Sequence, residues 1–269
     1  MSCLNPKGHI PPSVNSILTS SVVFACVLGG AVLGMFLRVY LPEEHLSGAT
    51  KETVKLGMAL VSTMSALVLG LLVSSAKTFY DTQGAELNQL SADVVVLDRL
   101  LAHYGPDTKD ARDELRASVI RLLDRIWPAE NTRPFREAQN QAPQTDASSE
   151  VLLDKIQALS PKDDKQRSLM GQTLSITVGV VRIRWLMYEQ SNASVSKTLL
   201  GVMVFWLTAV FVSFGLFAPR NATAVAGLCA GALSVSGAIF LILEMYMPYS
   251  GLIQISSSPL RAAIEHLGQ

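Results

Sequence analysis

The run LGMALVSTMSALVLGLLVSSA, residues 56–76, decides the fold of this chain. It contains no Asp, Glu, Lys or Arg, and a helix needs only ~20 apolar residues to cross ~30 Å of hydrocarbon. The run therefore predicts a membrane span. No proline occurs between Thr53 and Tyr104. The span is thus expected to continue as one helix beyond the membrane, with a length of roughly 75 Å at ~1.5 Å per residue.

Three other uncharged segments have the same character, and they divide the chain into two membrane hairpins around a polar middle. They are Ser13–Leu37, Thr198–Pro219 and Ala222–Leu243. Two spans precede the middle and two follow it. Both termini and the middle are therefore expected on the same side of the membrane.

These segments define an all-α chain with a simple domain organisation. We expect an N-terminal tail (1–13), four spans (14–41, 56–76, 198–219 and 222–243), a helical body (77–197) and a C-terminal segment (244–269). The formal net charge is zero, so no nucleic acid is expected as a partner. The expected partner is the lipid bilayer. The three cysteines indicate no disulfide framework, since Cys26 and Cys229 lie inside spans and Cys3 in the tail.

The basic residues near the span ends predict the orientation. More of them lie on the body side than on the other side. The body side has Lys7, Lys77, Arg182, Arg184, Lys197 and Arg261, and the other side has Arg38, Lys51, Lys55 and Arg220. The positive-inside rule therefore favours a multi-pass membrane protein with a cytoplasmic body and cytoplasmic termini.

The body is predicted to be helical throughout. Apolar residues recur at alternating three and four positions, as in a helix that packs on other helices: Leu87, Leu90, Val94, Leu97 and Leu101. Further helices are expected over 108–126, 150–159 and 163–189, a loop over 131–149, and a final short helix capped by Ser258. Trp127 and Trp185 are expected to pack inside the body, and Tyr246 and Tyr249 to lie at the membrane interface.

Two glycine pairs are spaced for close helix approach. Gly30 and Gly34 lie on one face of the first span, and Gly227 and Gly231 on one face of the last. This spacing lets a neighbouring backbone come near, either within one subunit or between subunits.

The second span also carries a row of small, weakly polar residues, here called the small-residue stripe. Its members are Ser62, Ala66, Gly70, Ser74 and Thr78. In a pore wall, small side chains leave room and hydroxyls help to solvate a partly dehydrated ion. Close helix packing requires the same residue types. The sequence leaves both interpretations open, and the stripe is the candidate pore lining.

No catalytic constellation is apparent. The four histidines are dispersed, and the chain has no HExxH, CxxC, GxSxG or phosphate-binding glycine loop. The acidic pairs Glu43–Glu44 and Asp163–Asp164 are typical of solvated surface charges. We therefore expect no enzyme activity, catalytic residue, cofactor or metal site.

Two stretches carry a resemblance to a known family. They are YDTQGAELNQLSADVVVLDRLLAHYGP, residues 80–106, and LEMYMPYSGLIQISSSPLR, residues 243–261. With the two-plus-two spans, they resemble a bestrophin-like family of bacterial and plant membrane proteins that lacks a settled function. Its remote relatives, the bestrophins, are homopentameric anion channels with the second span along the pore. Their calcium-binding residues have no match here.

The resemblance implies a homo-oligomeric ion channel of a bacterial inner membrane that conducts anions, with the second span lining the pore and a pentamer as the form to test. The alternative is a non-conducting, membrane-anchored scaffold or sensor that binds a partner through its body. The ion, the gating stimulus and the partner do not follow from the sequence.

Overall fold

The structure is a computed structural model that describes residues 16–40, 48–128, 148–191, 195–219 and 221–268. The described residues form helices without strands and divide into two compact units. The membrane unit comprises residues 1–79 and 194–246, and the body unit comprises residues 80–193 and 247–269. The expected loop at 131–149 falls almost entirely outside the described residues.

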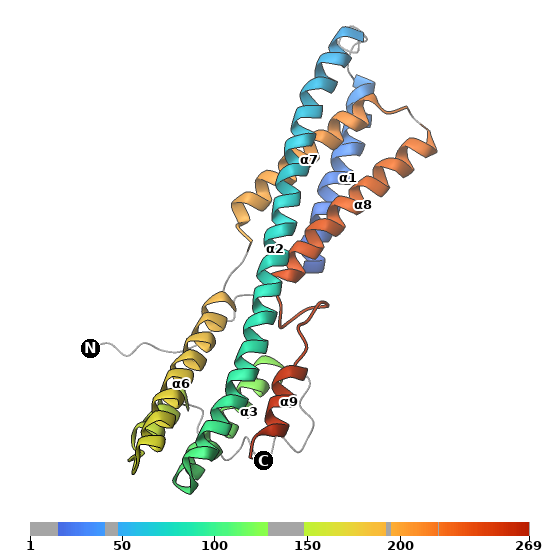
Figure 1. Cartoon of the computed structure of the whole chain (residues 1–269). Helices are drawn as coiled ribbons and strands as arrows, with labels where there is room; N and C mark the ends of the chain where they lie inside the picture. Colours follow the sequence, from blue (N-terminus) through green and yellow to red (C-terminus); the bar gives the residue numbers. More distant parts are fainter. Residues whose placement is uncertain (1–15, 41–47, 129–147, 192–194, 220, 269) are drawn as a thin grey trace, which may run out of the picture. The chain divides into compact units, whose positions relative to one another are not determined.

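Four helices of the described chain are long and apolar enough to cross a membrane. They are α1 (Ser16–Tyr40), α2 (Gly48–Tyr104), α7 (Lys197–Phe217) and α8 (Ala222–Met245) (Figure 1). The expectation of one helix running past Ala76 is confirmed, because α2 continues without interruption to Tyr104. It therefore supplies residues to both units.

In the membrane unit, α1 packs against both α7 and α8. Its buried face repeats every four residues, at Val23, Val27 and Ala31. These side chains meet apolar residues of α7 and α8, among them Met203, Phe211, Ala232 and Ile239. A hydrogen bond from the Ser236 hydroxyl to the Ser20 carbonyl (2.7 Å) also joins α8 to α1.

Glycines set the distance between α1 and α7. A Cβ added at Gly34 would collide with the backbone of Val212, and one at Gly215 would collide with the backbone of Ala31. A Cβ at Gly30 would lie 2.9 Å from the Thr208 side chain. The close approach predicted from Gly30 and Gly34 is confirmed. On the other helix, α7, Gly215 is the small residue that allows it.

The glycine pair of α8 behaves differently. A Cβ at Gly231 would touch the Phe211 ring at 3.3 Å, but a Cβ at Gly227 would meet nothing within 4 Å. At Gly227 no close approach occurs inside the chain, because this glycine borders a cavity. Close approach between subunits, the other possibility for this pair, stays a prediction.

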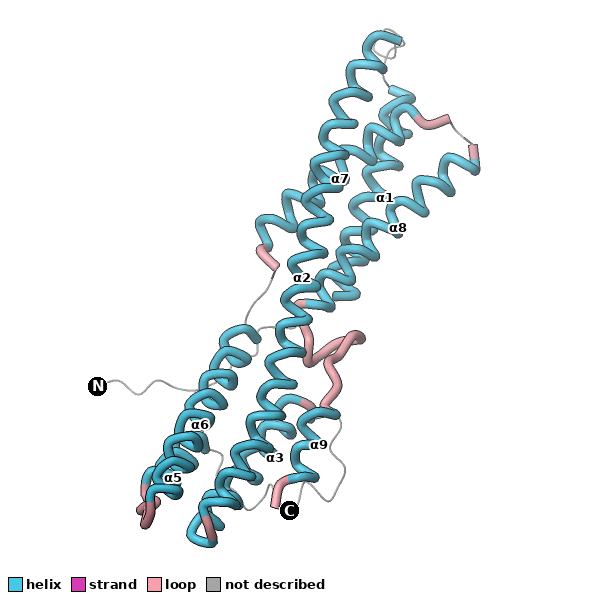
Figure 2. The backbone as a smooth tube through the Cα atoms, in the orientation of Figure 1, coloured by secondary structure: helices cyan, strands magenta, loops and turns pink. Residues whose placement is uncertain are grey.

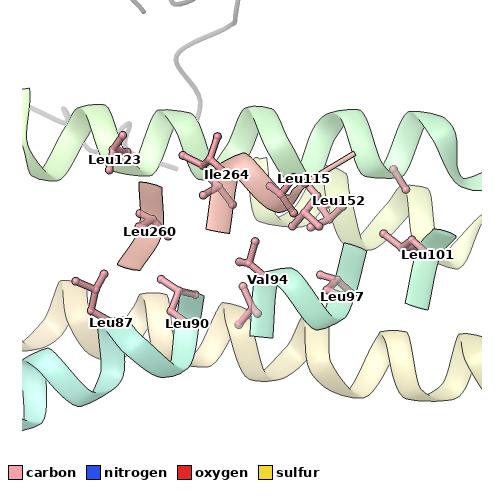
Figure 3. Packing of buried hydrophobic residues seen from close by; sticks show 14 of the residues in the cluster. Leu87, Leu90, Val94, Leu97, Leu101, Leu115, Leu123, Leu152, Leu260 and Ile264 are labelled. Atoms are coloured by element: carbon pink, nitrogen blue, oxygen red, sulfur yellow. The ribbon is translucent and has the colours of Figure 1, made fainter. Parts of the chain in front are cut away.

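The body unit is built from the second half of α2, α3 (Lys109–Ile126), α5 (Ser148–Gln157), α6 (Asp164–Ser191) and α9 (Ser258–His266) (Figure 2). The predicted apolar row of α2 is its core. Those five side chains are at most 1% exposed, and they face Leu115, Leu123, Leu152, Leu260 and Ile264 (Figure 3). The C-terminal helix is therefore an integral part of this core.

A buried ion pair also ties α2, α3 and the C-terminal end together. Arg112 donates to both carboxylate oxygens of Asp98, from Nε at 2.7 Å and from Nη2 at 2.8 Å, and the Gly268 amide donates to Oδ2 at 3.2 Å. Burial alone raises the pKa of Asp98, but these hydrogen bonds and the Arg112 charge outweigh burial and hold the pKa below its usual value. Asp98 is therefore a carboxylate at neutral pH.

Nearby residues cap the C-terminal end of α2 and the N-terminal end of α9. Gly105 ends α2 with φ at +130°, a conformation that favours glycine. The Thr108 hydroxyl donates to the carbonyls of Leu101 (2.6 Å) and Gly105 (2.8 Å). For α9 the cap is Ser257 rather than Ser258, and Pro259 still occupies the first turn.

The aromatic residues correct two expectations. Trp127 is 3% exposed and donates from Nε1 to the Ile255 carbonyl at 3.0 Å, as expected for a core residue. Trp185 is 66% exposed on α6, so the expectation that it packs inside the body is wrong for the single chain. Tyr249 lies in the body core edge-on to Trp127, with its hydroxyl bonded to Gln83, rather than at the membrane interface.

Candidate functional site

The candidate site is the membrane-spanning part of α2. Only 6% of the most apolar window of α2 is buried, against 28% in α1, 33% in α7 and 22% in α8. Three of the four membrane helices thus form a packed group, while α2 leaves most of its surface uncovered in a single chain. Lipid, water or other copies of the chain must cover this surface.

The packed side of α2 is narrow. Ser65 and Ala76 are its buried residues in the membrane unit, and Val68, Leu69 and Leu72 pack partly against the α1–α7–α8 core. This face fixes the rotation of the helix about its axis. It therefore determines which residues of α2 point away from the rest of the chain.

The small-residue stripe lies mostly on the uncovered surface. Ala66, Gly70, Ser74 and Thr78 are exposed, and a Cβ added at Gly70 would meet nothing within 4 Å. Ser62 is half-buried and lines a cavity shared with α7 and α8. Close packing inside the chain therefore does not explain the four exposed members, and Ser62 stands apart from them.

The uncovered side of α2 also carries leucines. Leu56, Leu60, Leu67 and Leu71 are between 62% and 74% exposed. Ala66 and Gly70 lie on one flank of this side, whereas Ser74, seven residues after Leu67, lies next to the leucines. The uncovered side is therefore one continuous surface that changes from small, weakly polar residues on one flank to bulky, apolar residues beside them.

The hydroxyls on α2 are compatible with both lipid and water around the helix. Thr63 donates to the Ala59 carbonyl at 2.9 Å, and Thr78 donates to the Ser74 carbonyl at 3.0 Å. Such bonds to the preceding turn satisfy the hydroxyl proton, and the oxygen can still accept a bond from water. From Leu56 to Ala76 the helix carries no charged side chain, and Lys55 and Lys77 flank this interval.

Among the described residues, no group of three or more His, Cys, Asp or Glu could hold a metal ion. Asp163 caps the start of α6 by accepting from the Gln166 amide at 2.6 Å, and Asp164 pairs with Arg167. Glu43 and Glu44 lie outside the described residues. The chemistry that remains on the uncovered membrane surface is that of hydroxyls, small side chains and flanking lysines.

Fold and surface together define a four-span, all-helical membrane protein with a helical body. The chain belongs to the bestrophin-like family, because the family's bestrophin-like domain matches residues 25–260. The resemblance drawn from residues 80–106 and 243–261 is thereby confirmed. No protein with a curated description matches the sequence.

Solved structures show the same fold. Three crystal structures of a bacterial bestrophin homologue from Klebsiella pneumoniae superimpose with TM-scores of 0.68, 0.67 and 0.63. Each is 12% identical in sequence; they cover 94%, 93% and 90% of this chain, and this chain covers 96%, 97% and 97% of theirs. At this identity the likeness establishes the shared fold.

Proposed function

We propose that the protein is a homo-oligomeric ion channel and that the exposed members of the small-residue stripe of α2 line its conduit. The observation that carries this proposal is the uncovered surface of α2 at membrane depth, on which Ala66, Gly70 and Ser74 are exposed. Membership of the bestrophin-like family supports it.

One helix cannot enclose a water-filled path. If α2 lines a conduit, several copies must bring their stripes together around a common axis, which accounts for a surface left bare by the rest of the chain. Closed rotational symmetry is the usual arrangement of such assemblies. The pentamer of the bestrophins is the form to test, and the ions would pass along the stripes.

Anion preference is the finer part of the proposal. The stripe itself carries no charge, so selectivity must come from groups outside the bilayer. Arg182 and Lys197 are exposed and Arg184 is half-buried. With the body on the cytoplasmic side of a bacterial inner membrane, these residues would give that mouth a positive potential and concentrate anions there. Reversal potentials in asymmetric KCl measure this preference.

Cysteine labelling tests the position of the conduit. In a background without Cys3, Cys26 and Cys229, single cysteines at Ala66 and Gly70 should react with water-soluble thiol reagents in the reconstituted protein. The thiolate is the reactive form, and it forms poorly in lipid or in a dry core. The controls are cysteines at Leu67 and Leu71, which are also exposed in the chain but each lie about 100° around the helix from the preceding residue, Ala66 or Gly70. These should react far more slowly.

A second variant connects the stripe to flux. Ala66→Phe places a bulky ring where the chain itself offers no obstruction. We expect the oligomer and its melting to be unchanged and the single-channel current in planar bilayers to fall. Unreactive stripe cysteines together with electrically silent bilayers would refute the conduit.

One observation favours the alternative of a scaffold or sensor. On α6 of the body, Val178, Trp185 and Tyr188 are exposed by 58%, 66% and 63%, and the two rings lie edge to face with centroids 5.9 Å apart. Exposed aromatics in water are typical of a binding surface. In a channel this face is expected to meet another copy. In a scaffold it would bind a different protein, and the bilayers would stay silent.

A further inference from the structure

The membrane unit contains a cavity of about 720 Å³ between α2, α7 and α8. Its volume falls within the ~300–1,000 Å³ typical of small-molecule sites. The apolar part of the lining includes Met58, Phe214, Phe217 and Leu228. The polar part consists of Lys55 and the hydroxyl residues Ser62, Thr63 and Ser213.

The lining changes character along α2. Lys51, Lys55 and Ser62 follow one another at spacings of four and seven residues, so they share one helical face. Lys51 lies toward the end of the span, and its Nζ is 5.9 Å from the centroid of the Phe217 ring. The cavity therefore runs from a cationic rim at the membrane boundary to an apolar interior over roughly 16 Å of helix.

A third cation lies at the same end of the membrane unit. Arg38, near the end of α1, donates from Nη1 to the Ala218 carbonyl at 2.5 Å, and Ala218 itself lines the cavity. Glu52 is exposed on α2 and is not among the lining residues. Among the described residues, the lining and its rim therefore carry the cations Lys51, Lys55 and Arg38 and no acidic side chain.

We propose that this cavity binds an anionic phospholipid, with its phosphate at Lys51 and Lys55 and an acyl chain along Met58, Phe214 and Leu228. A cationic rim above an apolar interior, placed at bilayer depth, complements an anionic headgroup above a hydrocarbon chain. A zwitterionic lipid fits the interior equally well but carries a headgroup cation that the lysines repel.

Gly227 shows how the cavity is kept open. It belongs to the lining, and a Cβ added there would meet nothing within 4 Å. A leucine at this position would add its bulk at the cavity wall, where its Cβ meets no protein atom, and reduce the space for the acyl chain. The glycine therefore offers a way to close the site while leaving the helices in place.

The test measures lipid bound to the full-length purified protein by native mass spectrometry. The probes are phosphatidylglycerol and phosphatidylcholine with identical acyl chains, and the released lipid is identified. We expect phosphatidylglycerol to be retained preferentially. Lys55→Gln should weaken its binding about fivefold and leave phosphatidylcholine unchanged, because one lysine at the membrane surface has an effect of about that size. Gly227→Leu should weaken the binding of both.

Two matched variants serve as controls. Lys77→Gln removes one charge from the other end of the same membrane segment. Gly57→Leu adds the same side chain at a glycine of α2 that also faces open space but lies outside the cavity lining. Both should retain lipid like the wild type. Circular dichroism and gel filtration show that each variant is folded.

Several results would overturn the proposal. One is equal retention of the two phospholipids by the wild type, and another is unchanged retention in both cavity variants. A free fatty acid released in place of a phospholipid would also overturn it. The proposal would also be overturned if Gly227→Leu kept its helicity but lost the oligomer. That result would mean that a second copy of the chain, rather than a lipid, fills the cavity of the wild type. None of these measurements depends on ion flux, so the site and the channel are tested separately.

Discussion

Replacing Gly34 by alanine tests the glycine contact between α1 and α7. The added Cβ collides with the backbone of Val212 and lies 2.8 Å from the Leu216 amide nitrogen. Backbone atoms cannot rotate away as a side chain can, so the helices must separate. Overpacking of this kind costs roughly 1–3 kcal/mol. The buried Gly215 offers a reciprocal variant, because its added Cβ collides with Ala31.

The matched control is Gly29→Ala in the same helix, where an added Cβ meets nothing within 4 Å. Alanine gains roughly 0.5–1 kcal/mol over glycine in a helix at either position, so this gain cancels in the comparison. Gly34→Ala should therefore unfold with a free energy roughly 1–3 kcal/mol below that of Gly29→Ala. Unfolding by SDS in mixed micelles, followed by circular dichroism, measures the difference. Equal free energies for the two variants would refute the close contact.

Two further predictions concern the body. Asp98→Asn should destabilise it by about 1.5–3 kcal/mol at neutral pH, because it removes the charge from the hydrogen bonds between buried Asp98 and Arg112. Since the folded-state pKa of Asp98 is depressed, the stability that its charge contributes is present above the unfolded pKa of about 3.9 and is lost as the pH falls through the folded pKa. Thermal melts at several pH values should therefore show the wild type and the variant converging only in acid. In chemical unfolding of the dissociated single chain, Trp127→Ala should cost about 3–5 kcal/mol and Trp185→Ala less than about 0.5 kcal/mol, because the first ring is buried and the second is exposed there. Similar costs for the two tryptophans would contradict this placement.

Local pattern predicted most of the helices. The period of apolar residues in 87–101 predicted the core face of α2, and those residues are buried as expected. The absence of proline between Thr53 and Tyr104 predicted the uninterrupted helix. These signals depend only on neighbours within a few turns, so they can be read without knowledge of the rest of the chain.

The candidate site was only partly accessible to such reasoning. The small-residue stripe is visible in the sequence, but its spacing does not distinguish a packed face from an uncovered one. The structure shows Ala66, Gly70 and Ser74 exposed, while Ser62, one turn earlier, borders a cavity. Helix rotation causes this difference, because residues four apart advance by about 40° per step and gradually leave the original face.

The sequence by itself determined that four helices cross a membrane, that a helical body lies between the hairpins, and which family the chain belongs to. The tertiary structure decided that Gly34 meets α7 while Gly227 borders open space, and that Trp127 is buried while Trp185 is exposed. It also placed the Gly268 amide on Asp98. Each of these outcomes depends on contacts between segments far apart in the chain. The period of one helix shows which residues share a face, and only packing determines what that face meets.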